Sequence, residues 1–225
     1  MSTESRSSLL HRYLDPATSL GEILFGLIMT LTFTLGAGII IQDEGREGAR
    51  ELLIAIIGCN IAWGIIDGAL YVVGELFGRG RLRRLGESIR RAPSAADAQS
   101  LVGGELDELL EPVVGESDRE ALYKRIADNV RSRPPAPNPI TKADLMGGFW
   151  SFWLVFLASV PAAIPFVVLD DARLALRISN AILLAFLFIS GYLWARYTMS
   201  KPWLVGLFFL IGGIALVAAA IALGG

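Results

Sequence analysis

One acidic residue, Asp67, lies inside an otherwise apolar segment that runs from Leu52 to Phe77. It is about ten residues, or about 15 Å of helix, from the C-terminal end of that segment. A carboxylate at this depth in lipid is costly, so its presence indicates a function such as binding a cation or carrying a proton. The alternative is that Asp67 is a hydrogen-bonded packing residue, for example with Asn60.

The same segment places its polar and small residues on one helical face. A rotation of about 100° per residue aligns Asn60, Gly64, Asp67, Gly68, Tyr71, Gly74 and Glu75. Gly64 and Gly68 have the spacing of closely packed membrane helices. A homodimer formed through this helix or the preceding one would bring two copies of Asp67 near one axis. Glu75 lies nearer the C-terminal end of the segment, where a glutamate could be either an ordinary solvated residue or a gate residue.

The preceding apolar segment has a matching face with Glu22, Gly26, Met29, Phe33 and Gly36. Met29 reaches a depth similar to that of Asp67, so a thioether and a carboxylate could meet across the two helices. This pair suits Mn²⁺ or Fe²⁺, because carboxylate oxygens accept these ions and sulfur adds preference over Mg²⁺ and Ca²⁺. Ordinary core packing is the alternative for Met29.

A second group of carboxylates lies in a charged central segment. Glu105, Glu108 and Glu111 are spaced three residues apart, so they would share a helix face and could gather a divalent cation. The alternative is a solvated acidic face. The acidic residues of this stretch are Glu105, Asp107, Glu108, Glu111, Glu116, Asp118 and Glu120.

Other chemistries are excluded by what the sequence lacks. With one cysteine and one histidine, Cys59 and His11, a single chain cannot build the usual zinc sites or a CxxC redox pair. No phosphate-binding loop, HExxH or GxSxG motif occurs. The net charge of -2 and the absence of basic runs with interleaved aromatics argue against nucleic acid. We therefore expect no enzyme, no nucleic-acid partner and no permanently bound cofactor.

The elements that must position these residues are membrane helices. The chain has 225 residues, is 53% hydrophobic and has a mean hydropathy of +0.54, which is too apolar for an ordinary soluble domain. We expect an all-α membrane protein with five transmembrane helices and a helical cytosolic domain between helices two and three. The expected spans are Ile23 to Ile41, Leu52 to Phe77, Gly147 to Leu169, Leu174 to Ala195 and Trp203 to Leu223.

The distribution of charge defines the domains and the orientation. Residues 78–146 hold 12 of the 20 Lys and Arg residues, and a cytosolic N-terminus places 16 of these 20 on the cytosolic side. We therefore expect residues 1–22 to be a cytosolic tail, 23–77 the first two spans, 78–146 the cytosolic domain and 147–225 the last three spans. The C-terminus would then lie outside. Trp150, Trp153, Tyr192, Trp194, Tyr197 and Trp203 cluster at the expected cytosolic ends of the last three spans.

The charged segment itself has a helical pattern. Gly80 to Arg91 could continue the second span, and two further helices are expected over Ala95 to Leu110 and Asp118 to Val130. Ser94 and Ser117 are the expected N-caps. The proline-rich stretch 133–139 cannot hold a helix and is expected to be a stiff linker.

Spans one and two resemble a known family. The runs EILFGLIMTLTFTLGAG (Glu22 to Gly38) and GCNIAWGIIDGALYVVGELFGRG (Gly58 to Gly80), followed by a charged helical block and three spans, look like a divergent bacterial branch of the vacuolar iron transporter (VIT) family. The resemblance implies a homodimeric, proton-coupled exporter of Fe²⁺ and related ions. It also implies that Glu105, Glu108, Glu111, Glu116 and Glu120 gather metal. Met29 stands where typical members carry an acidic residue.

These observations combine into one expected function and one alternative. We expect a bacterial inner-membrane antiporter that exports Fe²⁺ or Mn²⁺ in exchange for protons. Asp67 would be the intramembrane ligand, Met29 a soft co-ligand, and Glu22 and Glu75 the cytosolic gate, with Asn60 and Tyr71 also lining the path. Burial favours a protonated carboxyl and a bound cation favours a carboxylate, so one group could alternate between them. The alternative is a non-transporting membrane scaffold whose cytosolic helices recruit a partner.

Overall fold

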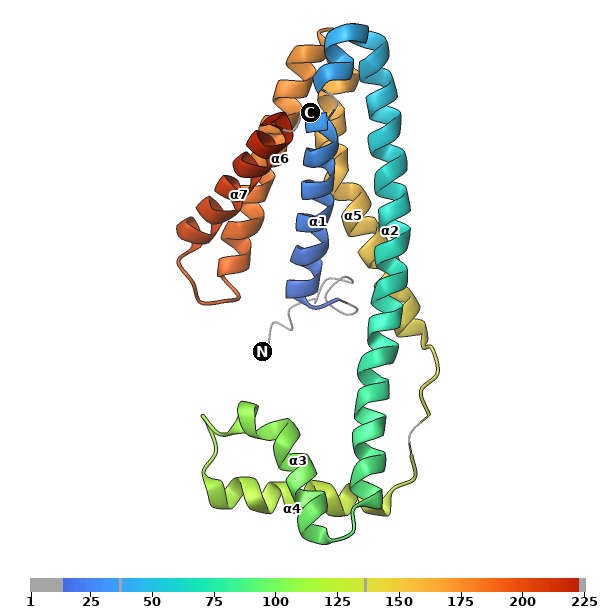
Figure 1. Cartoon of the computed structure of the whole chain (residues 1–225), viewed down its shortest axis with the longest axis vertical. Helices are drawn as coiled ribbons and strands as arrows, with labels where there is room; N and C mark the ends of the chain where they lie inside the picture. Colours follow the sequence, from blue (N-terminus) through green and yellow to red (C-terminus); the bar gives the residue numbers. More distant parts are fainter. Residues whose placement is uncertain (1–13, 37, 136, 223–225) are drawn as a thin grey trace, which may run out of the picture. The chain divides into compact units, whose positions relative to one another are not determined.

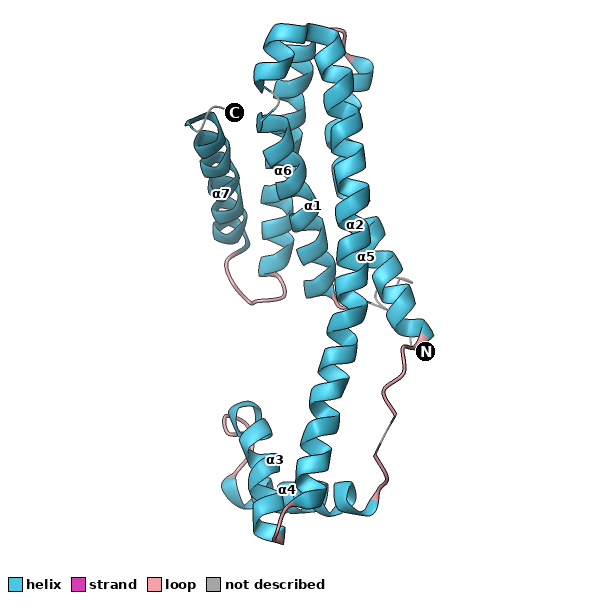
Figure 2. Ribbon diagram, turned by 45° about the vertical axis from the view of Figure 1, so that its right-hand side comes forward, coloured by secondary structure: helices cyan, strands magenta, loops and turns pink. Residues whose placement is uncertain are grey.

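A computed structural model describes residues 14–36, 38–135 and 137–222 (Figure 1). In these ranges the chain forms helices and no strand (Figure 2), so the expected all-α class is confirmed. The helices are α1 (Pro16–Gly36), α2 (Gly38–Arg91), α3 (Ala95–Leu110), α4 (Glu116–Ser132), α5 (Lys142–Val168), α6 (Ala172–Ala195) and α7 (Pro202–Ala222).

Helix length and composition indicate association with a membrane. Within the described ranges, 4 stretches are long and apolar enough to cross a bilayer: Pro16–Thr34, Glu47–Arg91, Lys142–Val168 and Ala172–Ala195. In place of the fifth expected span, α7 contributes a shorter apolar stretch, Pro202–Leu216. Large apolar side chains also lie on the outside of α2, where Ile54, Ile65 and Leu70 are about 60% exposed. Such faces are unusual in water and suit lipid.

The described chain divides into two compact units, each with its own core. The first contains the residues up to Val72 and those from Lys142 onward, and the second is Val73–Thr141. In the first unit, α1, α5 and α6 share a cluster of buried leucines with Ala162. In the second, the C-terminal part of α2 packs with α3 and α4 around Ile89, Val102 and Tyr123. Helix α2 contributes to both units.

Helix α1 begins at Pro16, earlier than the expected start at Ile23. Asp15 caps it, because its Oδ1 accepts hydrogen bonds from the backbone N–H groups of Ala17 and Thr18 at 2.9 and 3.0 Å. Proline is well tolerated at the first helical position, where its missing N–H would have no partner. The Thr18 hydroxyl also donates to Asp15, and these bonds lower the pKa of the Asp15 carboxyl. The expected N-terminal tail, residues 1–22, therefore includes the start of a helix.

The second unit follows the sequence pattern closely. Helix α2 runs without a break to Arg91 and α3 covers the expected residues. Ser94 caps α3, with its Oγ accepting the Asp97 N–H at 3.0 Å. The prediction that Ser117 caps α4 is wrong: the N-cap is Gly115, which has no side chain to bond, and α4 begins at Glu116. The described residues of the 133–139 linker are non-helical, as expected.

Candidate functional site

The backbone of α5 lies very close to those of α1 and α2. A Cβ atom placed on Gly68 would be 2.6 Å from the carbonyl oxygen of Gly148, and one on Gly26 would be 2.6 Å from that of Val155. Real Cβ contacts essentially never reach this distance, so only glycine fits. Gly64 also lies against α5, at Phe152. The glycine pair of α2 is therefore used for packing within one chain.

This close packing brings together polar side chains from three helices. Ser151 on α5 is fully buried, and its hydroxyl donates to Oε1 of Glu22 on α1 at 2.7 Å. The register of α1 against α2, described below, places the Glu22 carboxyl at the level of Asp67 on α2. Oδ2 of Asp67 is buried and has no hydrogen-bond partner among the described residues. We call Glu22 and Asp67 the carboxylate pair.

A buried polar contact sets the register of α1 against α2. The side-chain amide of Asn60 donates to Oγ1 of Thr30 at 3.3 Å and to the carbonyl oxygen of Ile56 at 2.9 Å, and both polar side chains are fully buried. From this contact, seven residues along α2 lead to Asp67 and eight back along α1 lead to Glu22, about 11 Å and about 12 Å respectively at roughly 1.5 Å per residue. Asn60 thus bonds to Thr30, and the register places Glu22 at the level of Asp67.

Met29 does not lie at that level. It is adjacent to Thr30 in sequence, and the Thr30–Asn60 contact therefore puts it about 9 Å along the helix axis from Asp67. The expected depth of Met29 depended on the positions of the span ends, which the sequence defines only approximately. The observed register replaces the expected thioether–carboxylate pair with two carboxylates.

Two buried polar residues of α5, Asp144 and Ser151, are not among the site residues predicted from the sequence. Asp144 lies in the first turn of α5 and is only 4% exposed. It shares a helix face with Gly147, Gly148 and Ser151 by the spacing i, i+3, i+4 and i+7, and the ring of Tyr71 lies directly on Gly147. Asp144 was assigned to the charged block because of its neighbours in sequence. The spacing of the small residues Gly147, Gly148 and Ser151 after Asp144 is the sequence signal that indicates a closely packed helix face.

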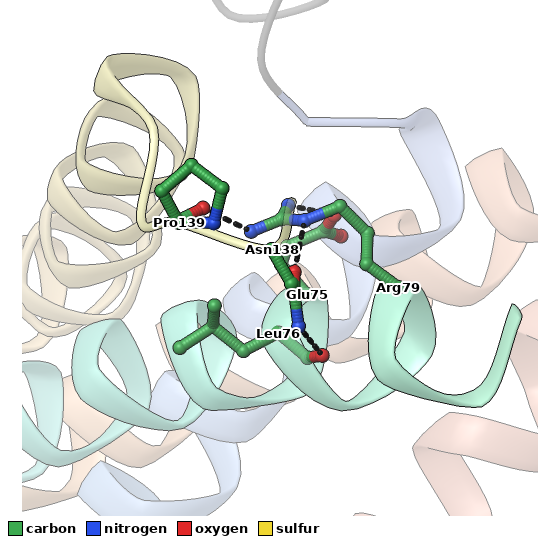
Figure 3. Close-up of polar contacts among 5 residues, drawn as sticks. All are labelled: Glu75, Leu76, Arg79, Asn138 and Pro139. Carbon is green, nitrogen blue, oxygen red and sulfur yellow. Dashed lines mark hydrogen bonds and ion pairs between the residues drawn. The ribbon is translucent and has the colours of Figure 1, made fainter. Parts of the chain in front are cut away.

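Glu75 lies in the second unit and is tied to the linker that follows α4. Its carboxylate is 3.8 Å from Nη1 of Arg79, with the Glu75 side chain 46% exposed. Figure 3 shows Arg79 between Glu75 and the linker, where its Nε donates to Asn138 Oδ1 at 3.0 Å and its Nη2 to the Pro139 carbonyl at 3.3 Å. Glu75 thus stands in a surface ion pair.

The acidic residues of α3 and α4 have partners of their own or are exposed. Glu105 forms an ion pair with Arg81 at 2.8 Å. Asp107 accepts a hydrogen bond from the Tyr123 hydroxyl at 2.8 Å. Burial of Tyr123 and this bond raise the pKa of its phenol. Glu111 is the C-cap residue of α3. The other glutamates that were expected to gather metal are all exposed: Glu108, Glu111, Glu116 and Glu120.

The described residues contain no group of three or more His, Cys, Asp or Glu side chains that could hold a metal ion. The carboxylate pair with Ser151 instead offers two carboxylates and one hydroxyl, all oxygen donors. Such a set can bind a hard or borderline cation or protons, with water completing the coordination. No protein-family model matches the chain, and no curated protein matches it.

Proposed function

We propose that this chain is a membrane transporter that exchanges a divalent cation for protons at the carboxylate pair. The observation that supports this most strongly is the convergence of Glu22 and Asp67 in an apolar bundle, with one buried carboxylate oxygen lacking a hydrogen-bond partner among the described residues. Carboxylates in membrane helices are expensive and are retained mainly where they handle ions or protons.

The chemistry of exchange follows from the repulsion within the pair. Two negative charges at one level of an apolar bundle are unfavourable, and either a proton or a cation relieves the repulsion. A proton on one carboxyl removes one charge, whereas a divalent cation neutralises both. Since a proton and a divalent cation cannot occupy the same carboxylate oxygens together, cation binding displaces the proton. That competition is the minimum required of an antiporter.

We propose Fe²⁺ or Mn²⁺ as the transported ion, because oxygen donors accept both and the resemblance to the vacuolar iron transporter family favours them. A single chain supplies too few donors for a complete shell, so waters or a second copy in a homodimer would supply the rest. In the proposed topology α7 is the fifth span of an inner-membrane protein, the N-terminus and the second unit are cytosolic, and the C-terminus lies outside. The exposed carboxylates of α3 and α4 then attract cations to the entrance.

A scaffold without transport is the second candidate. One contact favours it: Thr30 and Asn60 already show a buried polar pair that joins two helices of this bundle. If the carboxylate pair were another contact of this kind, Asp67→Asn would weaken the fold. In a transporter the variant keeps its fold and loses exchange.

Cation uptake into proteoliposomes tests the proposal. Wild type, Asp67→Asn and the matched control Glu51→Gln, an exposed carboxylate on the same helix, are compared under an imposed pH gradient with Fe²⁺, Mn²⁺, Mg²⁺ and Ca²⁺. We expect gradient-driven Fe²⁺ or Mn²⁺ uptake in wild type and Glu51→Gln, and none in well-folded Asp67→Asn. Absence of uptake of every ion by well-folded wild type would refute transport.

A further inference from the structure

A cleft of about 390 Å³ lies in the second unit, between the C-terminal part of α2, the end of α4 and the linker that follows. This volume is in the range of small-molecule sites. Four arginines line it, Arg79, Arg83, Arg90 and Arg133, together with Asn129 and several apolar side chains. No acidic residue is among the described residues that line it.

Local sequence explains why the cleft stays open. Arg133 precedes a proline, which disfavours helical backbone, and it ends α4 in an extended conformation with φ -106° and ψ 146°. Asn138 is held against α2: its amide donates to the Leu76 carbonyl at 3.1 Å while its Oδ1 accepts from Arg79, as Figure 3 shows. The described linker residues Pro134, Pro137 and Asn138 thus form one side of the cleft.

The positive charge in the cleft is not fully compensated. Arg79 faces Glu75, and Arg83 is 3.6 Å from Glu87. Arg90 and Arg133 line the cleft from α2 and from the end of α4, and neither guanidinium has a hydrogen-bond or ion-pair partner among the described residues. Two guanidinium groups without anionic partners in the described part of the chain thus share a small cleft.

Gly86 lines the cleft between Arg90 and Val130. A Cβ atom there would lie 3.7 Å from Nη1 of Arg90 and 3.8 Å from Cγ1 of Val130. The Arg90 guanidinium therefore lies along the turn of α2 that carries Gly86, on the side that faces α4.

This arrangement suits phosphate better than other anions. Guanidinium presents paired N–H donors that match two phosphate oxygens, and two such groups match the charge of a phosphate monoester. Leu82, Val130 and Pro137 supply apolar surface beside the charged part.

We propose that this cleft binds a small molecule carrying a phosphate monoester group, held by Arg90 and Arg133. Two sources share this chemistry: the headgroup of an anionic phospholipid and a soluble phosphate ester. The cleft begins two residues beyond Phe77, where the apolar run of α2 ends, which favours the lipid. The cleft lies wholly within the second unit, so the proposal does not depend on transport.

Binding to the full chain in neutral detergent tests the proposal. Isothermal titration compares dihexanoyl phosphatidic acid, glycerol 3-phosphate and, as the reference without net charge or a phosphate monoester, dihexanoyl phosphatidylcholine. The variant is the pair Arg90→Gln and Arg133→Gln. Its matched control is Arg84→Gln with Arg91→Gln, which removes the same charge from exposed positions of α2 that do not line the cleft. Circular dichroism verifies that both variants are folded.

We expect a phosphate monoester to bind wild type and the control alike, and to bind the cleft variant about tenfold or more weakly, because the variant lacks both guanidinium groups that would donate charge-assisted hydrogen bonds. Tighter binding of the phosphatidic acid than of glycerol 3-phosphate would identify the lipid as the source, and equal binding the soluble ester. Equal losses in the two variants would mean unspecific attraction and would overturn the proposal. So would failure of both phosphate monoesters to bind folded wild type.

Discussion

Replacing Gly68 by alanine tests the close packing that assembles the carboxylate pair. The added Cβ would lie 2.6 Å from the Gly148 carbonyl oxygen, and ordinary contact begins at 3.4 Å, so the two helices must separate by about 0.8 Å. Overpacking of this kind typically costs about 1–3 kcal/mol. At roughly 2–4 °C per kcal/mol for a chain of this size, we expect the Tm to fall measurably.

The matched control is Gly58→Ala on the same helix, because a Cβ there meets nothing within 4 Å. Any gain in helix propensity is common to both variants, and the difference between them isolates the steric effect. The assay is thermal unfolding of the purified protein followed by tryptophan fluorescence. If Gly68→Ala unfolds at the same temperature as Gly58→Ala, the close approach of α2 and α5 is incorrect.

Three further variants test local features. Ser94→Ala should destabilise the second unit by about 1 kcal/mol in chemical denaturation, because it removes the N-cap of α3, whereas Ser117→Ala should not; equal effects would refute the cap assignment. Burial and the bond to Asp107 raise the pKa of Tyr123, so the neutral phenol stabilises the fold below about pH 10, and this contribution is lost as pH rises through the raised value. Tyr123→Phe should remove that dependence, and a pH-stability profile that is unchanged would contradict it. Hydrogen bonds lower the pKa of Asp15, so its contribution is present above about pH 4 and is lost as pH falls through the lowered value. The stability difference between wild type and Asp15→Ala should disappear at low pH, and persistence there would argue against the cap.

Much of the helical pattern could be predicted from the sequence because it depends on local periodicity and local hydrogen bonds. The bounds of α3, the cap at Ser94 and the continuation of α2 to Arg91 follow from residues within a few positions of each other. The start of α1 was placed too late because its polar first turn was assigned to the tail, although Asp15 and Pro16 mark a helix start.

The site itself depends on how the helices pack, which a single sequence does not contain. The sequence predicts an intramembrane carboxylate at Asp67, but it pairs that carboxylate with Met29. The register comes from the tertiary contact between Thr30 and Asn60, which places Glu22 there instead. Ser151 escaped notice because a serine in an apolar helix usually bonds to its own backbone, whereas this one donates to Glu22.

Proton movement during cation transport tests the central claim most directly. Proteoliposomes loaded with a pH indicator receive a Mn²⁺ gradient, and the luminal pH is followed for wild type, Glu22→Gln, Asp67→Asn and the control Glu51→Gln. We predict that Mn²⁺ entry drives protons out in wild type and in the control, and that both variants of the carboxylate pair abolish this movement while remaining folded. Mn²⁺ entry without proton movement, or proton movement that survives in both variants, would contradict exchange at the carboxylate pair.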